Sequence, residues 1–228
     1  MSDAPNMQTN EVPQSDAQAA QAESTPARKR PKPGERRIQI LQTLAEMLQQ
    51  PTADRITTAA LAARLDVSEA ALYRHFASKA QMFEGLIEFI EQSVFTLINQ
   101  IIEREDAAGV GAPGVGARQA AKIVAMLMQF AERNPGMARV MVGDALVFEN
   151  ERLQQRMNQF FDKIESTLKQ CLRAAPVASD SATPTVDAQV RASVMAAFIA
   201  GRLQRYVRSG FKRLPSEHLE ASLGVLLG

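Results

Sequence analysis

Apolar residues recur at helical spacing along most of this 228-residue chain, and two short clusters of them stand close together between residues 56 and 76. The pattern predicts one helix over residues 58–65 and a second that starts after Ser68. The apolar positions are Ile56, Leu61, Ala62 and Leu65 in the first cluster and Leu72 and Phe76 in the second. A three-residue turn separates the helices, which predicts a helix-turn-helix unit of the kind that enters the major groove of DNA.

Capping residues mark where these helices are expected to begin. Thr57 or Thr58 is placed to accept a backbone N–H at the start of the first short helix, and Ser68 at the start of the second. Ser78 and Gln81 have the spacing of a capping box, in which the two side chains satisfy each other's free backbone donors. A further helix is therefore expected directly after the helix-turn-helix unit.

The periodicity of the whole chain predicts an all-α fold. A helix over about 35–50 is expected to complete a three-helix domain over residues 34–78, and residues 79–228 to form a larger helical dimerisation and partner-binding domain. The helices expected in the larger domain are about 79–105, 118–133, a short helix after Pro135, 144–173 and 186–209, with glycine- or proline-rich loops at 106–117 and 175–185.

Composition agrees with a soluble regulator. Hydrophobic residues make up 46% of the chain, which is enough for a substantial core. No secretory signal and no uninterrupted apolar span is found, so we expect a cytoplasmic protein that does not enter the membrane. The single cysteine, Cys171, excludes an internal disulfide framework and falls in an apolar register that predicts a core position.

Positive charge is concentrated on the expected DNA-binding domain. Residues 28–79 contain ten Lys/Arg against five Asp/Glu, and the rest of the chain contains sixteen against twenty. Residues 1–27 lack leucine, isoleucine and aromatic residues and are expected to be disordered, and residues 28–37 form a basic, proline-containing segment. We interpret this segment as an arm that contacts phosphates or a minor groove; the alternative is a solvated tail.

The residues of this unit resemble the TetR family of DNA-binding regulators, above all in the run Leu72 to Phe76 followed by Ser78-Lys79. The runs 68–76, 86–91 and 132–136 narrow the resemblance to the SlmA group of nucleoid occlusion factors. The resemblance extends from about residue 36 to 211 and weakens after 169. One departure is Asp66, which stands where these turns usually carry glycine; aspartate tolerates the left-handed backbone that this position needs.

The candidate DNA contacts fall into three groups. Thr57 and Thr58 lie at a helix N-terminus and are expected to hold a phosphate, or to serve only as caps. At the matching Tyr, His and Lys positions the family contacts the DNA backbone, which implies this role for Tyr73, His75 and Lys79. The residues expected to face the bases are Ser68, Glu69, Ala70 and Tyr73, whereas Arg74 is a further candidate contact at the end of the recognition helix. For His75 a structural role, and for Glu69 a role limited to the helix dipole, stay open.

Partner surfaces are expected on the larger domain. Met82 and Phe89 fall on one flank of the apolar stripe of the helix 79–105, so this helix is either buried on more than one side or forms part of a docking groove. The resemblance implies that the partner is the cell-division protein FtsZ. It also implies a homodimer through the last two long helices, where Ala197 and Gly201 allow close approach, although packing within one chain explains small residues as well. A two-fold dimer would read a palindromic site in double-stranded DNA.

Other chemistry is weakly indicated. There is no nucleophile elbow, no metal-ligand spacing and no dinucleotide motif, so neither catalysis nor a cofactor nor a metal site is expected. A group of cations lies near the end of the last long helix: Arg202, Arg205, Arg208, Lys212 and Arg213. They either complement the helix dipole or form a second anion site. Two functions remain, a DNA-bound nucleoid occlusion factor that inhibits FtsZ assembly and a ligand-responsive repressor, and the shortage of converging polar groups in the larger domain favours the first.

Overall fold

The computed structural model describes residues 34–50, 56–109, 114–147, 149–174 and 183–227. By its internal contacts the chain divides into residues 1–31 and 32–228, and all of the described residues belong to the second unit. The predicted disordered tail, and the basic segment up to residue 33, lie outside the described residues. No β-strand occurs in the described part of the chain, which confirms the all-α prediction.

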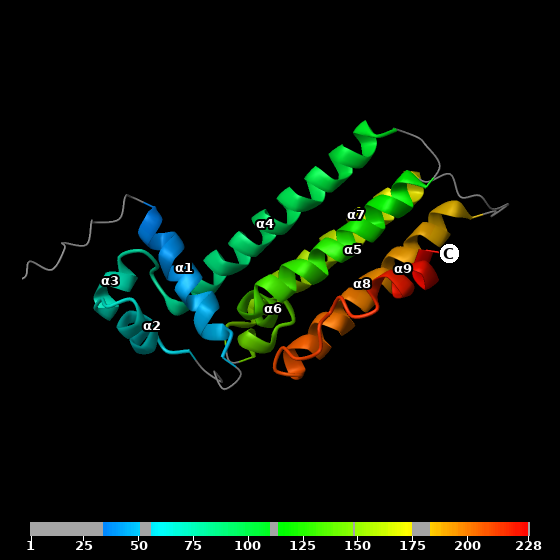
Figure 1. Ribbon diagram of the computed structural model, residues 1–228. Coiled ribbons are helices and arrows are strands. Elements are labelled where there is room, and N and C mark those ends of the chain that lie inside the picture. The colour runs from blue at the N-terminus through cyan, green and yellow to red at the C-terminus, as the bar shows by residue number, and fades with distance from the viewer. Residues whose placement is uncertain (1–33, 51–55, 110–113, 148, 175–182, 228) are drawn as a thin grey trace, which may run out of the picture. The chain divides into compact units, whose positions relative to one another are not determined.

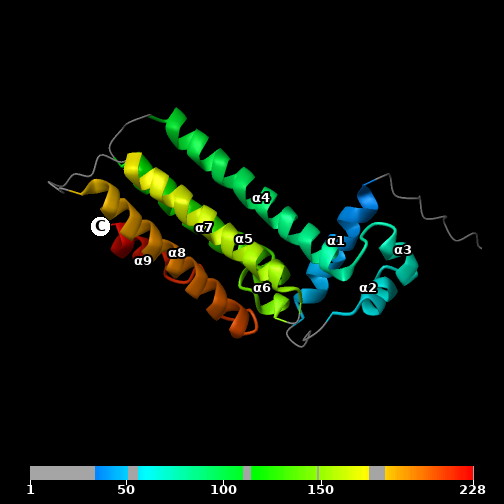
Figure 2. The same cartoon turned by 180° about the vertical axis from the view of Figure 1, so that it is seen from behind.

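Figure 1 shows the helices of the second unit in chain order. They are α1 (Glu35–Leu48), α2 (Thr58–Arg64), α3 (Glu69–Tyr73), α4 (Lys79–Ala107), α5 (Val115–Arg133), α6 (Pro135–Met141), the 3-10 helix η1 (Asp144–Leu146), α7 (Glu151–Ala174), α8 (Pro184–Arg208) and α9 (Leu219–Leu227). Helices α1–α3 gather at the N-terminal end of α4, and α4, α5, α7 and α8 lie side by side (Figures 1 and 2).

Apart from shifts of one or two residues at helix ends, the helices differ from the sequence prediction in three ways. Helix α5 begins at Val115 instead of 118, directly after Gly114, which adopts a left-handed φ of 79°. The stretch predicted over 144–173 is divided into η1 and α7, and the side chain of Asn150 accepts a bond from the Arg152 N–H at the start of α7. Helix α9 was not predicted, because none of its residues is buried and its sequence lacks a clear apolar face.

The core of the larger domain forms where α4, α5, α7 and α8 meet. Its fully buried side chains include Ile90, Val94 and Ile98 of α4, Ile123 and Leu127 of α5, Ile164 and Leu168 of α7, and Ile199 and Leu203 of α8. Cys171 is 5% exposed, as its register predicts, and burial raises the pKa of its thiol to about 11. Removing this apolar surface from water is the main stabilising contribution to the four helices.

The N-terminal domain, in which α1 packs with the helix-turn-helix helices α2 and α3, is joined to the larger domain along a seam between α1 and α6. A Cβ atom added to Gly136 would lie 1.9 Å from the carbonyl oxygen of Ala45, so the two backbones touch where only glycine fits. Arg139 is buried beside this contact; its Nη1 donates to the carbonyls of Leu48 and Gln50 at 3.4 and 3.2 Å. Arg139 thus caps the C-terminal end of α1 and fixes that helix on α6.

Candidate nucleic-acid interface

The turn between α2 and α3 depends on a left-handed residue. Asp66 has φ 54°, one of three non-glycine residues with positive φ in the described part of the chain. This conformation returns the backbone so that the N–H of Val67 donates to the carbonyl of Ala62 at 3.1 Å, which satisfies an orphan carbonyl at the end of α2. The expectation that aspartate tolerates this backbone is confirmed, and the turn brings α3 across α2.

Side-chain caps fix the N-termini of both short helices. The Thr57 hydroxyl accepts from the Ala60 N–H at 3.1 Å, and the Ser68 hydroxyl accepts from the Ala71 N–H at 3.3 Å. Thr58 does not cap: its hydroxyl donates to Oε2 of Glu69 at 2.6 Å. The two N-termini are therefore linked through a threonine and a carboxylate, an interaction between α2 and α3 that the sequence pattern did not reveal.

Helix α3 has one buried side and a broad exposed side. Leu72 is 1% exposed and is the buried residue of this helix, whereas Tyr73 is 45% exposed. The other predicted contacts on this element are also exposed: Ser68, Glu69, Ala70, Arg74 and His75. The exposed side carries hydroxyl, carboxylate, phenol, guanidinium and imidazole groups, which together are able to bond phosphates and base edges.

Arg37 of α1 holds the end of α3 in place. Its Nη1 donates to the carbonyl of His75 at 3.1 Å, and its guanidinium lies 4.2 Å from the centre of the Phe76 ring. The sequence placed Arg37 in the basic segment 28–37 and in the first turn of the helix expected over about 35–50. The contact joins residues 38 positions apart, so no local pattern could have identified this positioning role.

Lys79 is less free than the sequence implied. Its ammonium group forms an ion pair with the Glu149 carboxylate and lies 5.6 Å from the centre of the Phe83 ring. Both side chains of the ion pair are largely buried, with 24% and 12% of their surfaces exposed. A DNA phosphate that used Lys79 would therefore compete with Glu149, which precedes α7.

The capping box at the start of α4 forms in a modified way. The Ser78 hydroxyl accepts from the Gln81 N–H at 3.2 Å, as expected. The Gln81 side chain, however, accepts from the N–H of Ala77 at 2.9 Å, one residue before the position expected for a capping box. The helix start predicted after Ser78 is nevertheless correct.

The structure corrects one candidate partner residue. Met82 is 1% exposed and lies beside the equally buried Leu44 and Leu61. The alternative in which this helix is buried on more than one side is confirmed at its first turns, which are covered by α1 and by Phe76 as well as by the larger domain. Met82 is thus a core residue. Phe89 is 37% exposed, so it remains available on the surface.

The surface of α4 near Phe89 carries ion pairs to α7. Arg152 pairs with Glu84, and Arg156 pairs with Glu91 at 2.8 Å. These α7 arginines border a shallow hollow of about 280 Å³ together with Glu84. The Glu91 carboxylate also raises the pKa of Arg156 above its usual value, so this guanidinium stays charged.

An apolar stripe is left exposed on α8. Val186, Val190 and Val194 are 57%, 56% and 48% exposed, and Ala197 and Gly201 continue the stripe at helical spacing. Ala197 and Gly201 are exposed among the described residues, and a Cβ at Gly201 would meet nothing within 4 Å, so packing within one chain does not explain these small residues there. Elsewhere on the protein, the described residues contain no cluster of metal-binding side chains and no helix apolar and long enough to span a bilayer.

Comparisons with protein families match both halves of the chain. Residues 40–86 match the bacterial regulatory proteins of the tetR family, and residues 118–227 match the SlmA-like group of tetracyclin repressor-like C-terminal domains. The nucleoid occlusion factor SlmA of Idiomarina loihiensis is 48% identical over 84% of this chain and 93% of its own length. The corresponding proteins of a Marinomonas species and of Vibrio cholerae are 50% and 47% identical, over 82% and 81% of this chain and 90% of each relative.

Solved structures share the fold at much lower identity. A FadR regulator from Bacillus subtilis, solved in complex with stearoyl-CoA, superposes with a TM-score of 0.63 at 14% identity, covering 84% of this chain and 97% of that one. A transcriptional regulator from a Rhodococcus species gives a TM-score of 0.58 at 21% identity over 84% and 94%. These similarities establish the arrangement of helices.

Proposed function

Because the chain belongs to the TetR family of bacterial regulatory proteins, and within it to the SlmA nucleoid occlusion factors, we propose that it binds specific DNA sites and blocks cell division over the chromosome. The observation that carries this proposal is the sequence identity of 47–50% to relatives named nucleoid occlusion factor, over most of this chain and of theirs. The protein would act in the cytoplasm on the nucleoid, where bound DNA marks the position of the chromosome.

The proposed DNA contacts follow from exposure and position. Tyr73, Arg74 and His75 end α3 on its exposed side, while Ser68, Glu69 and Ala70 start it. We assign the first group to the phosphate backbone and the second, with Tyr73, to the bases. Thr57 and Thr58 would lie beside a phosphate at the α2 N-terminus, and Lys79 would bind one after leaving Glu149.

Among the proposed base contacts, Glu69 is the one whose side chain is bonded to the side chain of another helix. Its carboxylate already accepts from Thr58, so a base amino group would have to share that oxygen or use the other one. In a selection from random duplexes, we expect Glu69→Ala to change the preferred sequence while total affinity for DNA stays similar. An unchanged preference would restrict Glu69 to linking α2 and α3.

A homodimer would place two α3 helices on one palindromic site. The exposed valine stripe of α8 supports this assembly, since such a stripe on a long helix needs a partner and its small residues let a second helix approach closely. We propose that α7 and α8 pair with their copies. Val190→Arg together with Val194→Arg should give a folded monomer in sedimentation-velocity experiments.

FtsZ is the proposed protein partner, and exposed Phe89 on α4 is the residue that we assign to this surface. The decisive experiment is sedimentation of FtsZ polymers with the protein, its selected DNA duplex, or both. We expect the least polymer when both are present. Phe89→Ala should restore the polymer without changing DNA affinity, whereas no effect of saturating wild-type dimer on polymer would favour a ligand-responsive repressor.

A further inference from the structure

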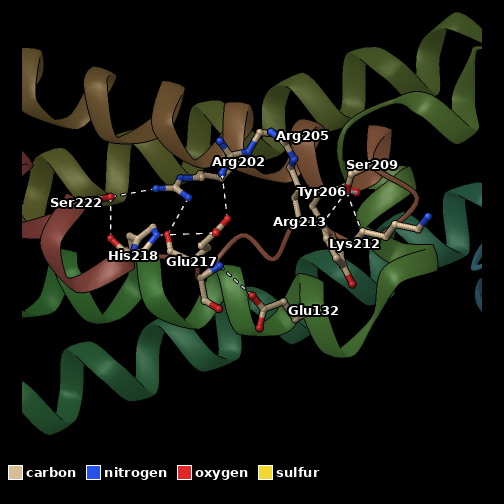
Figure 3. Close-up of polar contacts among 11 residues, drawn as sticks. Glu132, Arg202, Arg205, Tyr206, Ser209, Lys212, Arg213, Glu217, His218 and Ser222 are labelled. Atoms are coloured by element: carbon tan, nitrogen blue, oxygen red, sulfur yellow. Dashed lines mark hydrogen bonds and ion pairs between the residues drawn. The ribbon is translucent and has the colours of Figure 1, made fainter.

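A surface hollow of about 700 Å³ lies between α8 and the chain that leads to α9 (Figure 3). Four cationic residues line it, and they come from two segments: Arg202 and Arg205 from α8, and Lys212 and Arg213 from the chain that follows it. The carboxylate among its lining residues is Glu217. The volume is that of a small-molecule site, and the lining carries a clear excess of positive charge.

Arg202 is held in position on one wall of the hollow. Its Nη1 donates to the carbonyl of Glu217 at 2.8 Å, its Nη2 donates to the Ser222 hydroxyl at 3.0 Å, and its guanidinium lies 4.9 Å from the centre of the Phe198 ring. Figure 3 shows Arg202 reaching from α8 toward Glu217 and Ser222. A side chain fixed in this way loses little conformational freedom when it binds a ligand.

The turn after α8 fixes the backbone of the second cationic segment. The Ser209 hydroxyl accepts from the N–H groups of Lys212 and Arg213 at 3.1 and 2.9 Å and donates to the Tyr206 carbonyl at 2.8 Å. Phe211, within this turn, has φ 64° and packs its ring edge-on against Tyr206. The positions of Lys212 and Arg213 are therefore set by a defined turn.

A bond to α5 anchors the far end of this segment. The N–H of Ser216 donates to Oε1 of Glu132 at 2.9 Å, and Pro215 beside it is buried. His218, which lines the hollow, follows with φ 54°. Unfavourable backbone conformations of this kind are commonly maintained at ligand sites.

The helix dipole does not account for these cations. Arg202 bonds residues of the following segment and not the last carbonyls of α8, and Lys212 and Arg213 lie beyond the helix end at Arg208. Arg205 approaches Glu217 only to 3.7 Å. Lys212 and Arg213 form no ion pair with a carboxylate in the described ranges, so most of the positive charge around the hollow is not neutralised by the protein.

We propose that this hollow binds a small soluble molecule that carries two or more linked phosphate groups. Guanidinium groups bond phosphate oxygens in pairs, and several cations contributed by two segments of the chain suit a row of linked phosphates better than a single phosphate. Two or more phosphates would also offset the excess charge. The hollow shares no residue with the DNA contacts proposed for α2–α4, so both ligands are able to bind at once.

The test is calorimetric titration of the full-length protein with inorganic triphosphate at constant ionic strength. We expect one site per protomer, and Arg205→Gln with Arg213→Gln should weaken it about tenfold or more. Both residues are exposed, so the fold should be unaffected. The matched control is Arg104→Gln with Arg191→Gln, which removes the same charge from exposed positions outside the hollow and should leave affinity unchanged.

Three results would overturn the proposal. Absence of binding by the wild-type protein at millimolar triphosphate is the first, and equal weakening in the two double variants is the second, since that indicates only general charge attraction. The third arm repeats the titration with the protein saturated by its selected DNA duplex. Persistence of the triphosphate site supports a small-molecule ligand, whereas its loss would assign the binding to the DNA-binding surface.

Discussion

The helix-turn-helix unit and the larger domain are stabilised in different ways. Helices α4, α5, α7 and α8 bury long apolar faces against one another, whereas α3 buries only Leu72. The order of α2 and α3 comes from caps, from the left-handed Asp66 and from Arg37 at the end of α3. The surface proposed to read DNA is exposed, so its shape depends on a few specific bonds and on the seam that joins α1 to α6.

The largest effect on both stability and DNA binding is expected from a substitution in the seam between α1 and α6. Gly136→Ala places a Cβ 1.9 Å from the Ala45 carbonyl oxygen, so a backbone must shift. We expect a loss of about 3 kcal/mol or more in unfolding free energy and loss of DNA binding, measured by urea unfolding and duplex titration. Gly224→Ala is the control, because its Cβ meets nothing within 4 Å and α9 should tolerate it. Equal stability of both variants would show that the seam is not tight.

Substitutions at two adjacent residues of α3 should affect stability and DNA binding separately. Leu72→Ala should lower the unfolding free energy by about 2–5 kcal/mol because it leaves a cavity in the core. Tyr73→Ala should change it by about 0.5 kcal/mol or less, while weakening binding to specific and random duplexes alike. Thermal unfolding and DNA titration of each variant provide the measurement. If Tyr73→Ala bound DNA like the wild type, the assignment of this face would be wrong.

The Lys79–Glu149 ion pair joins the start of α4 to the segment before α7, and its removal should have a smaller effect, on DNA affinity. Glu149→Gln removes the charge that competes for Lys79, so we expect DNA affinity to increase by roughly 2- to 5-fold, the size of a weak ion pair. Fluorescence anisotropy with a labelled duplex at fixed salt measures the change. Glu151→Gln, an exposed carboxylate at the start of α7, controls for the loss of one negative charge. An equal increase in both variants would point to net charge alone.

The smallest expected effect is on the thermal stability of the larger domain, and it depends on pH. Hydrogen bonds from Lys122 and Arg118 hold the pKa of the Glu105 carboxyl below its usual value. A lowered pKa stabilises the fold above the usual pKa of glutamate, and this contribution is lost as pH falls through the lowered value. Glu105→Gln should therefore melt slightly lower than the wild type at neutral pH, and the difference should vanish in acid. A difference independent of pH would exclude the charge as its cause.

Local features were predictable from the sequence, and contacts between distant residues were not. Residues within a few positions of one another were enough to predict the helix-turn-helix, its caps at Thr57 and Ser68, and the left-handed backbone of Asp66. The bond from Arg37 to His75 and the ion pair of Lys79 with Glu149 join positions 38 and 70 apart. Met82 was misplaced because the helical wheel of α4 does not reveal how many neighbours cover its first turns.

The absence of a side chain at residue 136 also limits how this protein is able to change over evolution. No single substitution there is compatible with the present approach of α1 to α6, since every other amino acid carries a Cβ. A descendant that held α1 at a different distance from α6 would need compensating mutations on both helices before either was tolerated. The placement of the three N-terminal helices on the larger domain is therefore expected to persist long after the exposed residues of α3 have diverged.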